Sequence, residues 1–380
     1  MAGIYLHIPF CKKACHYCNF HFSTQTTHLQ AFVDAMIQEI EFQKNYLNEP
    51  IETIYFGGGT PSLLHEAQLK AIIEAIHAHF KVATTIECTL EANPDDIDLN
   101  KLAEWKKLGI NRLSIGIQSF QAVALSWMNR AHTVAQSHAA IELAKQAGFN
   151  NLSIDLIYGT PTLTDQALME DLDWIDRYQI NHVSCYALTV EDKTALKKRI
   201  EKAQIEDVDP EKQARHFDIV CAKLKSMGME HYEISNFAKP GFRSQHNSNY
   251  WSGKTYLGLG PSAHSFNTIS RQWNIANNAL YIQSIGKGQL NFEMEYLTEA
   301  NRFNEYIMSS LRRMEGFDLD YIQSTFGKSY YAHSIATLLE MASKNMFVQN
   351  GNQYSLKNEA KFLADGIASD FFILGSAPAP

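Results

Sequence analysis

The sequence predicts an α/β fold: a partial barrel of six parallel strands with their helices, followed by a smaller, mainly helical C-terminal domain. Three observations lead to this prediction. Short β-branched or apolar runs alternate with segments of helical spacing over residues 1–228. Residues of unusual chemistry follow several of the predicted strands rather than one. After Gly228 the alternation stops, and helical segments precede a hairpin signal.

Six strand–helix units make up the regular part. The predicted strands cover residues 4–8, 53–56, 86–91, 112–117, 152–157 and 182–187. The helices that follow them are predicted over residues 29–44, 66–79, 99–108, 134–147, 166–178 and 210–227. Several of these helices run into the glycine that helix C-termini favour. Consecutive units of this kind imply parallel strands with right-handed crossovers.

The order of elements fits both a barrel and an open doubly wound sheet. A doubly wound sheet gathers its ligands at one switch point, whereas β/α barrels place site residues after many strands. Here three cysteines follow the first strand, and a glycine-rich turn follows the second. Glu91 and Gln118 end the third and fourth strands, and Asp155 lies on the fifth. This distribution favours the partial barrel.

The C-terminal third has a different organisation. Residues 229–296 are predicted to connect the barrel, over residues 1–228, with a small domain over residues 297–380. Helical segments at 299–314, 320–326 and 332–344 precede two strand-like halves, within 346–356, that meet at Asn350 and Gly351. Helices followed by a hairpin predict a winged-helix-like domain. Residues 377–380 are expected to fray.

Composition excludes several classes of function. The chain has 380 residues, 45% of them hydrophobic and 19% charged, and a net charge of −8. Without a basic stripe to neutralise phosphates, no nucleic acid is expected as a partner. There is no basic, apolar leader and no apolar stretch long enough to span a bilayer. Six cysteines in no regular framework fit a reducing compartment, so we expect a cytoplasmic protein.

The run HIPFCKKACHYCNF places Cys11, Cys15 and Cys18 in a C-x3-C-x2-C spacing. A cubane iron–sulfur cluster is normally held by four cysteines, so three would leave one iron open to another ligand. Zinc is the alternative, because His16 or His21 could complete the four protein ligands of a closed site. The spacing alone leaves both interpretations open.

With an aromatic residue before its last cysteine, this motif resembles that of the radical S-adenosylmethionine (SAM) superfamily. The runs Y-x-H-I-P-F-C, F-G-G-G-T-P-S and I-D-L-I-Y-G-x-P are together similar to the oxygen-independent coproporphyrinogen oxidase family and its relatives, the HemW heme chaperones. The resemblance extends from Tyr5 to about His264. It implies a [4Fe–4S] cluster on the three cysteines, with SAM chelating the open iron. It also implies an electron donor to the cluster, and cleavage of SAM to an adenosyl radical.

The turn Gly57-Gly58-Gly59-Thr60-Pro61 lets the backbone approach a charged ligand. It lacks the lysine and spacing of a P-loop, and alone such a run is more often a tight turn. The resemblance implies that SAM is held by Tyr5, Gly58, Gly59, Thr60, Glu91, Gln118, Arg130 and Asp155. Independently, an acid such as Asp155 in an apolar strand needs a partner. We therefore expect Asp155 and Arg130 in a polar pocket.

Two features separate the subfamilies. In the oxidases the motif is C-x3-C-x2-C-x-C, and an N-terminal extension precedes the cluster. Here Phe20 takes the place of the further cysteine, and the extension is missing. The HemW signature H-N-x-x-Y-W is matched by residues 246–251. These features imply a heme chaperone that hands heme to an acceptor protein, of a respiratory or membrane-associated kind. A coproporphyrinogen III oxidase is the alternative, and a zinc-binding barrel of other function is the third.

His246 is a candidate heme ligand, because imidazole is a common axial donor. Tyr250 and Trp251 offer flat faces to a macrocycle. The other interpretation of His246 is a histidine hydrogen-bonded at the junction of barrel and tail. His7 and His264 are weaker candidates. No catalytic residue is predicted, since the role of SAM in a carrier could be conformational or redox.

Overall fold

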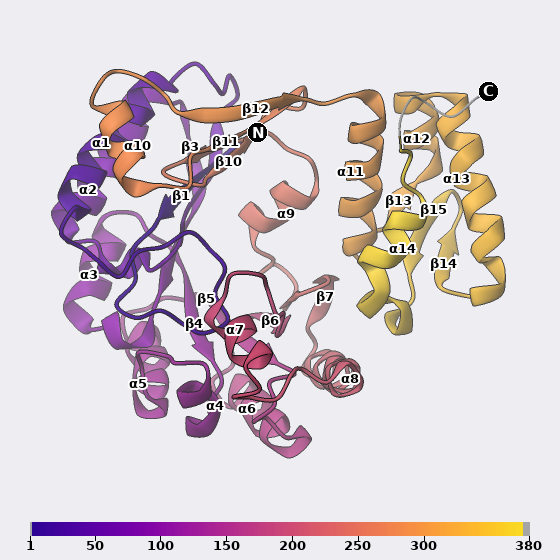
Figure 1. Cartoon of the computed structure of the whole chain (residues 1–380), viewed down its shortest axis with the longest axis horizontal. Coiled ribbons are helices and arrows are strands. Elements are labelled where there is room, and N and C mark those ends of the chain that lie inside the picture. Colours follow the sequence, from indigo (N-terminus) through magenta and orange to yellow (C-terminus); the bar gives the residue numbers. More distant parts are fainter. Residues whose placement is uncertain (1, 375–380) are drawn as a thin grey trace.

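The structure is a computed structural model and describes residues 2–374; the residues predicted to fray, 377–380, lie outside them. Its centre is a curved sheet with helices on the outside (Figure 1). The first six strands are β1 (Ala2–Ile8), β2 (Ile51–Gly58), β3 (Val82–Ala92), β4 (Arg112–Gln118), β5 (Asn151–Tyr158) and β6 (His182–Ala187). They pair in chain order and in parallel. Within residues 2–374, β1 and β6 do not pair with each other, so the barrel is partial, as predicted.

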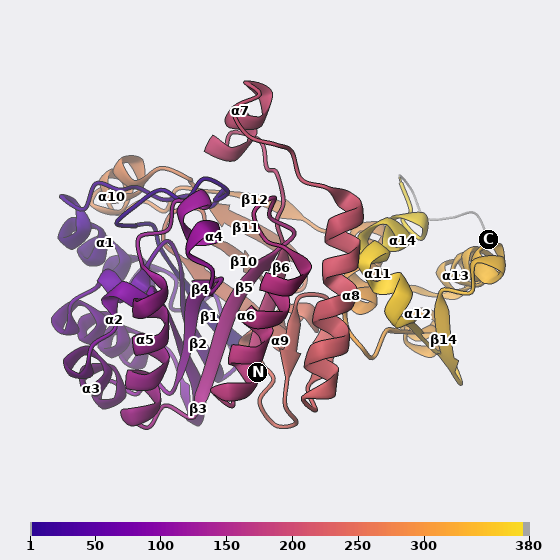
Figure 2. The ribbon, with the colours of Figure 1, turned by 90° about the horizontal axis from the view of Figure 1, so that it is seen from below.

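Six helices, one after each of these strands, match the predicted ones to within two residues at each end. They are α1 (Leu29–Phe42), α2 (Glu66–His79), α3 (Leu99–Lys107), α5 (Val134–Gln146), α6 (Asp165–Arg177) and α8 (Pro210–Ser226). Side chains such as Thr133 and Asp209 accept backbone N–H groups at their starts. Gly109 and Gly148 follow two of their ends with φ of +86° and +77°, where other residues are strained. Among the strand–helix units, two short helices were not predicted: α4 (Ala122–Trp127), and α7 (Ala195–Glu201), which stands away from the barrel (Figure 2).

The sheet continues beyond both edges of the predicted barrel. Next to β1 it adds β9 (Tyr256–Leu259) in parallel, then β10 (His264–Phe266), β11 (Ser270–Asn274) and β12 (Phe292–Tyr296). Next to β6 it adds β8 (Asn236–Ala238) and β7 (Glu230–Glu233), both antiparallel to their neighbours. These strands have three to five residues each, too few for a periodic signal. Between them lie α9 (Gln245–Trp251) and α10 (Asn278–Ile285), which contacts α1.

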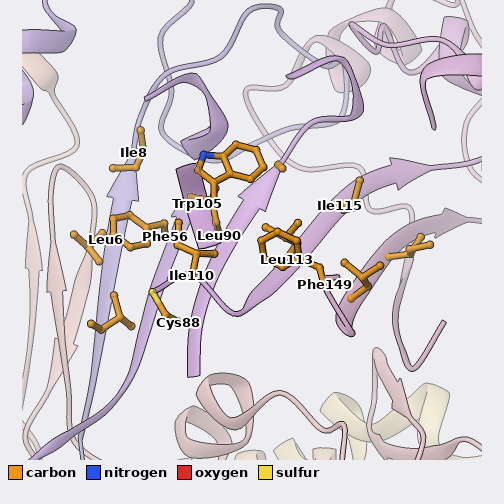
Figure 3. Close-up of a cluster of buried hydrophobic side chains, with 14 of the residues drawn as sticks. Leu6, Ile8, Phe56, Cys88, Leu90, Trp105, Ile110, Leu113, Ile115 and Phe149 are labelled. Atoms are coloured by element: carbon orange, nitrogen blue, oxygen red, sulfur yellow. The ribbon is translucent and has the colours of Figure 1, made fainter. Parts of the chain in front are cut away.

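One face of the parallel strands is apolar and lies under the helices. Successive side chains of a strand point to opposite faces, so Leu6 and Leu90 face the helices whereas Tyr5 and Glu91 face the barrel interior. Figure 3 shows this outer layer: Leu6, Ile8, Phe56, Cys88, Leu90, Leu113 and Ile115 from the strands, with Trp105, Ile110 and Phe149 over them. Each large side chain buried in this way contributes roughly 1.5–3 kcal/mol. The apolar side chains are thus used on the outside, and the interior is left polar.

After β12 the chain forms a second unit beside the barrel (Figure 1). It contains α11 (Glu299–Arg312), α12 (Leu319–Phe326), α13 (Lys328–Met341) and α14 (Ala364–Asp370), and the sheet β13 (Phe317–Asp318), β15 (Gln353–Leu356) and β14 (Phe347–Asn350). Its apolar core is its own and is centred on Phe303, Phe317 and Phe371. The hairpin turn is Gly351 and Asn352, one residue later than predicted, because Asn350 pairs with Gln353. The domain boundaries stay a prediction.

None of the helices in residues 2–374 combines the length and the apolar character that crossing a membrane requires.

Candidate functional site at the carboxyl ends of the barrel strands

The cysteine loop follows β1 and the glycine turn follows β2. Since these strands are neighbours in the sheet, the loop and the turn lie side by side. His7 and Ile8 pair with Gly57 and Gly58, and the Gly59 N–H donates to Ile8 O at 2.8 Å. A Cβ atom at Gly59 would lie 2.7 Å from Phe10 O, and one at Gly58, where φ is +105°, would lie 2.6 Å from His7 Nδ1. Packing against the start of the cysteine loop therefore requires Gly59, and the positive φ and the His7 ring favour glycine at position 58.

The three cysteines of this loop are free and half-buried. The loop is held by Cys11 N–H, which donates to Ser23 O at 3.0 Å. Burial raises the pKa of the Cys11 thiol, against a hydrogen bond from the buried Thr60 side chain, and raises the pKa of Cys18 to about 11. Without a bound cation the Cys11 and Cys18 thiols stay protonated at neutral pH, so their role as ligands depends on the metal group itself.

The zinc alternative needs a fourth protein ligand. His16 Nδ1 lies 2.8 Å from Trp127 O, and His21 Nε2 lies 2.7 Å from Asn278 Oδ1, so both predicted candidates have other partners. Among residues 2–374, no three His, Cys, Asp or Glu side chains are arranged to hold one metal ion. A cubane differs from a single ion in this respect, because each thiolate binds a separate iron.

Arg130 joins the cysteine loop to the ends of β3 and β4. Its Nη1 donates to Cys15 Sγ at 3.3 Å, and its Nη2 donates to Asn93 Oδ1 at 2.8 Å and to Gly116 O at 2.9 Å. Its Nε is buried without a hydrogen-bond partner in the described structure. Buried donors are rarely left unpaired, so this nitrogen is available to an acceptor such as a carboxylate.

Gln118, at the end of β4, has a φ of +67°. This backbone region is costly for residues other than glycine and is concentrated at functional sites. A Cβ atom at Gly116 would lie 3.0 Å from Gln118 Nε2 and 3.2 Å from Arg130 Nη2. Gln118 and Arg130 therefore meet over Gly116.

The two acids predicted for the site lie inside the barrel. Tyr55 OH donates to Glu91 Oε1 at 2.8 Å, and Ser114 Oγ donates to Asp155 Oδ1 at 3.1 Å. Burial and the nearby Asp155 charge raise the pKa of Glu91 to about 7, and burial raises the pKa of Asp155. A Cβ atom at Gly57 would lie 3.0 Å from Tyr5 Cε2 and 3.1 Å from Glu91 Oε1, so Tyr5 adjoins Glu91.

The main cation near these acids is one that the sequence analysis missed. Arg112, at the start of β4, is 1% exposed. Its charge lowers the pKa of Glu91 and of Asp155, against the effect of burial. The charge of Arg130 acts on Asp155 too, although no hydrogen bond joins the two within residues 2–374. Arg112 shares the inward face of β4 with Ser114, Gly116 and Gln118, and this spacing of two was the available signal.

Helix α9 covers the amino end of the barrel. The backbone N–H groups of Gln245 and His246 donate to the Glu87 carboxylate at 2.9 and 3.0 Å. His246 Nδ1 lies 2.8 Å from Thr53 Oγ1, and its ring stacks on Tyr55 with centroids 5.0 Å apart. Burial lowers the pKa of His246 to about 3. The cavity beside it measures about 10 Å³, room for one water molecule.

In this conformation His246 is therefore a hydrogen-bonded histidine, which is the second of its two interpretations. The other two candidate histidines lie elsewhere. His7 is buried, with Nε2 2.8 Å from His21 O. His264 is exposed on β10, where its ring stacks with Trp273.

Comparisons with known proteins identify the family. The model of the radical SAM superfamily matches residues 5–175. A heme chaperone HemW from Bacillus subtilis (strain 168) is 32% identical over 375 residues, which are 98% of this chain and 99% of that protein. The chain belongs to the HemW family. A HemW from Mycobacterium tuberculosis is 31% identical over 371 residues, 96% of this chain and 93% of the relative.

Among solved structures, coproporphyrinogen III oxidase (HemN) from Escherichia coli is similar with a TM-score of 0.85 and 22% sequence identity, over 97% of this chain and 89% of that one. At this identity the likeness establishes the fold alone. The fold predicted from the sequence, a partial barrel followed by a smaller C-terminal unit, is thereby confirmed for both parts. Membership of the radical SAM superfamily implies a [4Fe–4S] cluster and SAM.

Proposed function

We propose that this chain is a heme chaperone, which binds heme and transfers it to an acceptor protein with the help of a [4Fe–4S] cluster and SAM. The observation that carries the proposal is its similarity, over nearly the full length, to proteins named heme chaperone HemW. Two features of the chain agree with it. Phe20 stands where the oxidases have a further cysteine, and residues 246–251 match H-N-x-x-Y-W.

In this proposal Cys11, Cys15 and Cys18 hold three irons of the cluster. When bound, the cluster supplies an electron that can cleave the sulfonium of SAM. The donor set fits such a cluster, because three free thiols lie on one loop and no protein ligand is needed for the fourth iron. The Arg130 guanidinium lies beside this set, with Nη1 3.3 Å from Cys15 Sγ.

The same residues fit SAM by charge. The carboxylates of Glu91 and Asp155 suit the sulfonium and amino groups, and the unpaired Arg130 Nε suits the carboxylate. On this proposal Tyr5 and Gln118 line the site beside these charges, and Gly58, Gly59 and Thr60 border it with backbone groups. Arg112, at the start of β4, stabilises the ionised forms of Glu91 and Asp155.

Heme, a heme-accepting protein and an electron donor to the cluster are the partners that the proposal requires. Ligation of heme by His246 stays a prediction. Since His246 is covered by Tyr55 and bonded to Thr53, that ligation would require α9 to move.

The oxidase is the competing function, and one assay separates the two. Anaerobically reconstituted protein is incubated with coproporphyrinogen III, SAM and a strong reductant, beside a known oxidase as positive control. We expect no protoporphyrinogen IX from this chain while its cluster is intact and the control is active. Formation of protoporphyrinogen IX would overturn the chaperone proposal and show decarboxylation without a cysteine at position 20.

A further inference from the structure

A cavity of about 470 Å³ lies between the added edge of the barrel sheet and the C-terminal unit. Tyr250 and Trp251, at the end of α9, and Tyr256 on β9 line one side of it; Tyr306 on α11 and Tyr321 on α12 line the other. In Figure 1, α9 lies between the barrel and α11. The volume falls in the range of about 300–1,000 Å³ that is typical of pockets for drug-sized ligands.

Aromatic side chains gather in the walls of this cavity. Tyr250 lies 5.1 Å from Trp251 and 5.1 Å from Tyr256, and Tyr306 lies 4.6 Å from Tyr321, between ring centroids. Tyr250 and Tyr321 are each 47% exposed. Large rings that face one cavity and remain exposed mark a binding surface. They suit a flat aromatic ligand, which can stack on their faces.

The charges of the cavity select an anion. Although the chain has a net charge of −8, the lining includes Arg271, Arg302 and Arg313 against the single acid Glu305. Glu305 is ion-paired with Arg271. In residues 2–374 neither Arg302 nor Arg313 has an ion pair, and the buried Nε of Arg313 has no hydrogen-bond partner. Although Arg313 Nη2 donates to Ser310 Oγ at 3.3 Å, the Arg313 Nε and the Arg302 guanidinium are available to carboxylates.

A flat macrocycle with two carboxylates matches this lining, and heme is such a molecule. The walls also provide donors for iron, since tyrosine oxygen and methionine sulfur serve as heme ligands, and Met308 on α11 joins the tyrosines here. His246 does not line this cavity. Tyr250 and Tyr256 line both this cavity and the small one beside His246, so these two residues lie between them.

The cavity is separate from the SAM site. Tyr256 is adjacent to Gly3 in the sheet, at the amino end of β1, whereas Cys11 follows the carboxyl end of that strand. We infer that the carried heme binds in this cavity, with its ring against Tyr250, Tyr256 and Tyr321 and its carboxylates toward Arg302 and Arg313. The inference rests on the proposed function, and it names where the cargo lies.

The test is titration of hemin into the full, cluster-reconstituted chain and into variants on the cavity wall. Arg302→Glu and Tyr321→Ala change exposed side chains, so we expect the fold to be retained. Each is expected to weaken hemin binding by about ten- to a hundredfold, from the loss of a charge-assisted contact or of a stacking face. Lys328→Glu is the control: it reverses an exposed charge of the same unit outside the cavity and should leave hemin affinity unchanged.

A further variant addresses His246. His246→Asn keeps a polar group near Thr53 and should bind hemin as the wild-type chain does. If His246→Asn loses hemin binding while Arg302→Glu and Tyr321→Ala keep it, the cavity is not the heme site, although the proposed function stands. If the unaltered chain with its cluster binds no hemin, the proposed function itself fails.

Discussion

The His246 ring stacks on the Tyr55 ring with centroids 5.0 Å apart, and the hydroxyl of the same Tyr55 donates to Glu91. Tyr55 thus contacts both α9, which carries the H-N-x-x-Y-W motif, and Glu91 of the proposed SAM site. The rings of Tyr5 and His7 continue this column, at 6.1 Å steps, toward the cysteine loop. The two ends of the barrel are therefore joined by packed side chains.

Replacing any one of Cys11, Cys15 or Cys18 with serine should abolish the cluster, because iron–sulfur clusters select soft thiolate ligands. Iron and acid-labile sulfide, measured after anaerobic reconstitution, should fall to background. Cys221→Ser is the matched control, since Cys221 is also free and half-buried but lies on α8. A Cys15→Ser variant with full iron and sulfide, or a wild-type chain that holds zinc without iron, would contradict this assignment.

The affinity for SAM should rise with pH. Burial and the Asp155 charge raise the pKa of Glu91 to about 7, so the anion that attracts the SAM cation forms only as the pH passes that value. Below it, affinity should fall by up to about tenfold per pH unit. Equilibrium dialysis at several pH values measures this. Glu91→Gln should bind more weakly at high pH and show a flatter profile; an unchanged profile would remove Glu91 from the site.

The raised pKa of Glu91 also makes the stability of the fold depend on pH, and this dependence is opposite in direction to that of the SAM affinity. Without SAM, Glu91 ionises near 7 in the folded chain but near its ordinary value of 4.5 when unfolded. Its contribution to the free energy of unfolding is therefore present at low pH and is lost as the pH rises from about 4.5 to about 7. Urea unfolding across this range should show a smaller decrease for Glu91→Gln than for the wild-type chain. Equal decreases would show that Glu91 is not perturbed.

Removal of the buried Arg112 charge should strongly destabilise the barrel. Arg112→Met leaves Glu91 and Asp155 without their nearby cation, and breaking a buried charge arrangement in this way costs about 3–5 kcal/mol. The control is Arg215→Met, which breaks the exposed 2.8 Å ion pair with Asp165 and should cost under about 1 kcal/mol. Urea midpoints measure both, and equal midpoints would mean that Arg112 does not compensate the acids.

The strand–helix units could be predicted because each carries its own local signals. For α5, Thr133 marks the start with a capping box and Gly148 follows the end. The extensions of the sheet could not be predicted, since strands such as β8 have three residues and exist through pairing with distant segments. Tertiary pairing, not local preference, determines them.

The site residues divide in the same way, into those that a local motif identified and those that depend on tertiary contacts. Motifs located Arg130 and Glu91, but their partners Asn93 and Tyr55 come from other loops and strands and carried no signal of their own. Arg112 was missed because one charge at the start of an apolar strand is usually exposed. For His246 the sequence left two interpretations, a heme ligand and a hydrogen-bonded histidine, and only the fold provides the partner, Thr53, that the second one requires.

The added edge of the sheet also supports a stability prediction. A Cβ atom at Gly258, on β9, would lie 2.0 Å from His264 O, so Gly258→Ala must move backbone and should destabilise by about 1–3 kcal/mol or more. Gly366→Ala on α14 meets nothing within 4 Å and should stabilise by about 0.5–1 kcal/mol. Thermal unfolding compares them; a Gly258→Ala variant as stable as wild type would contradict this packing.

The most direct test of the account is heme transfer. The full chain, reconstituted with its cluster and loaded with heme, is mixed with a heme-free, membrane-associated cytochrome, and the acceptor's absorption spectrum is followed over time. The account predicts that the acceptor gains heme and the chain loses it, faster than from free hemin at the same concentration. Retention of the heme by the chain, or loading no faster than from free hemin, would contradict a chaperone function.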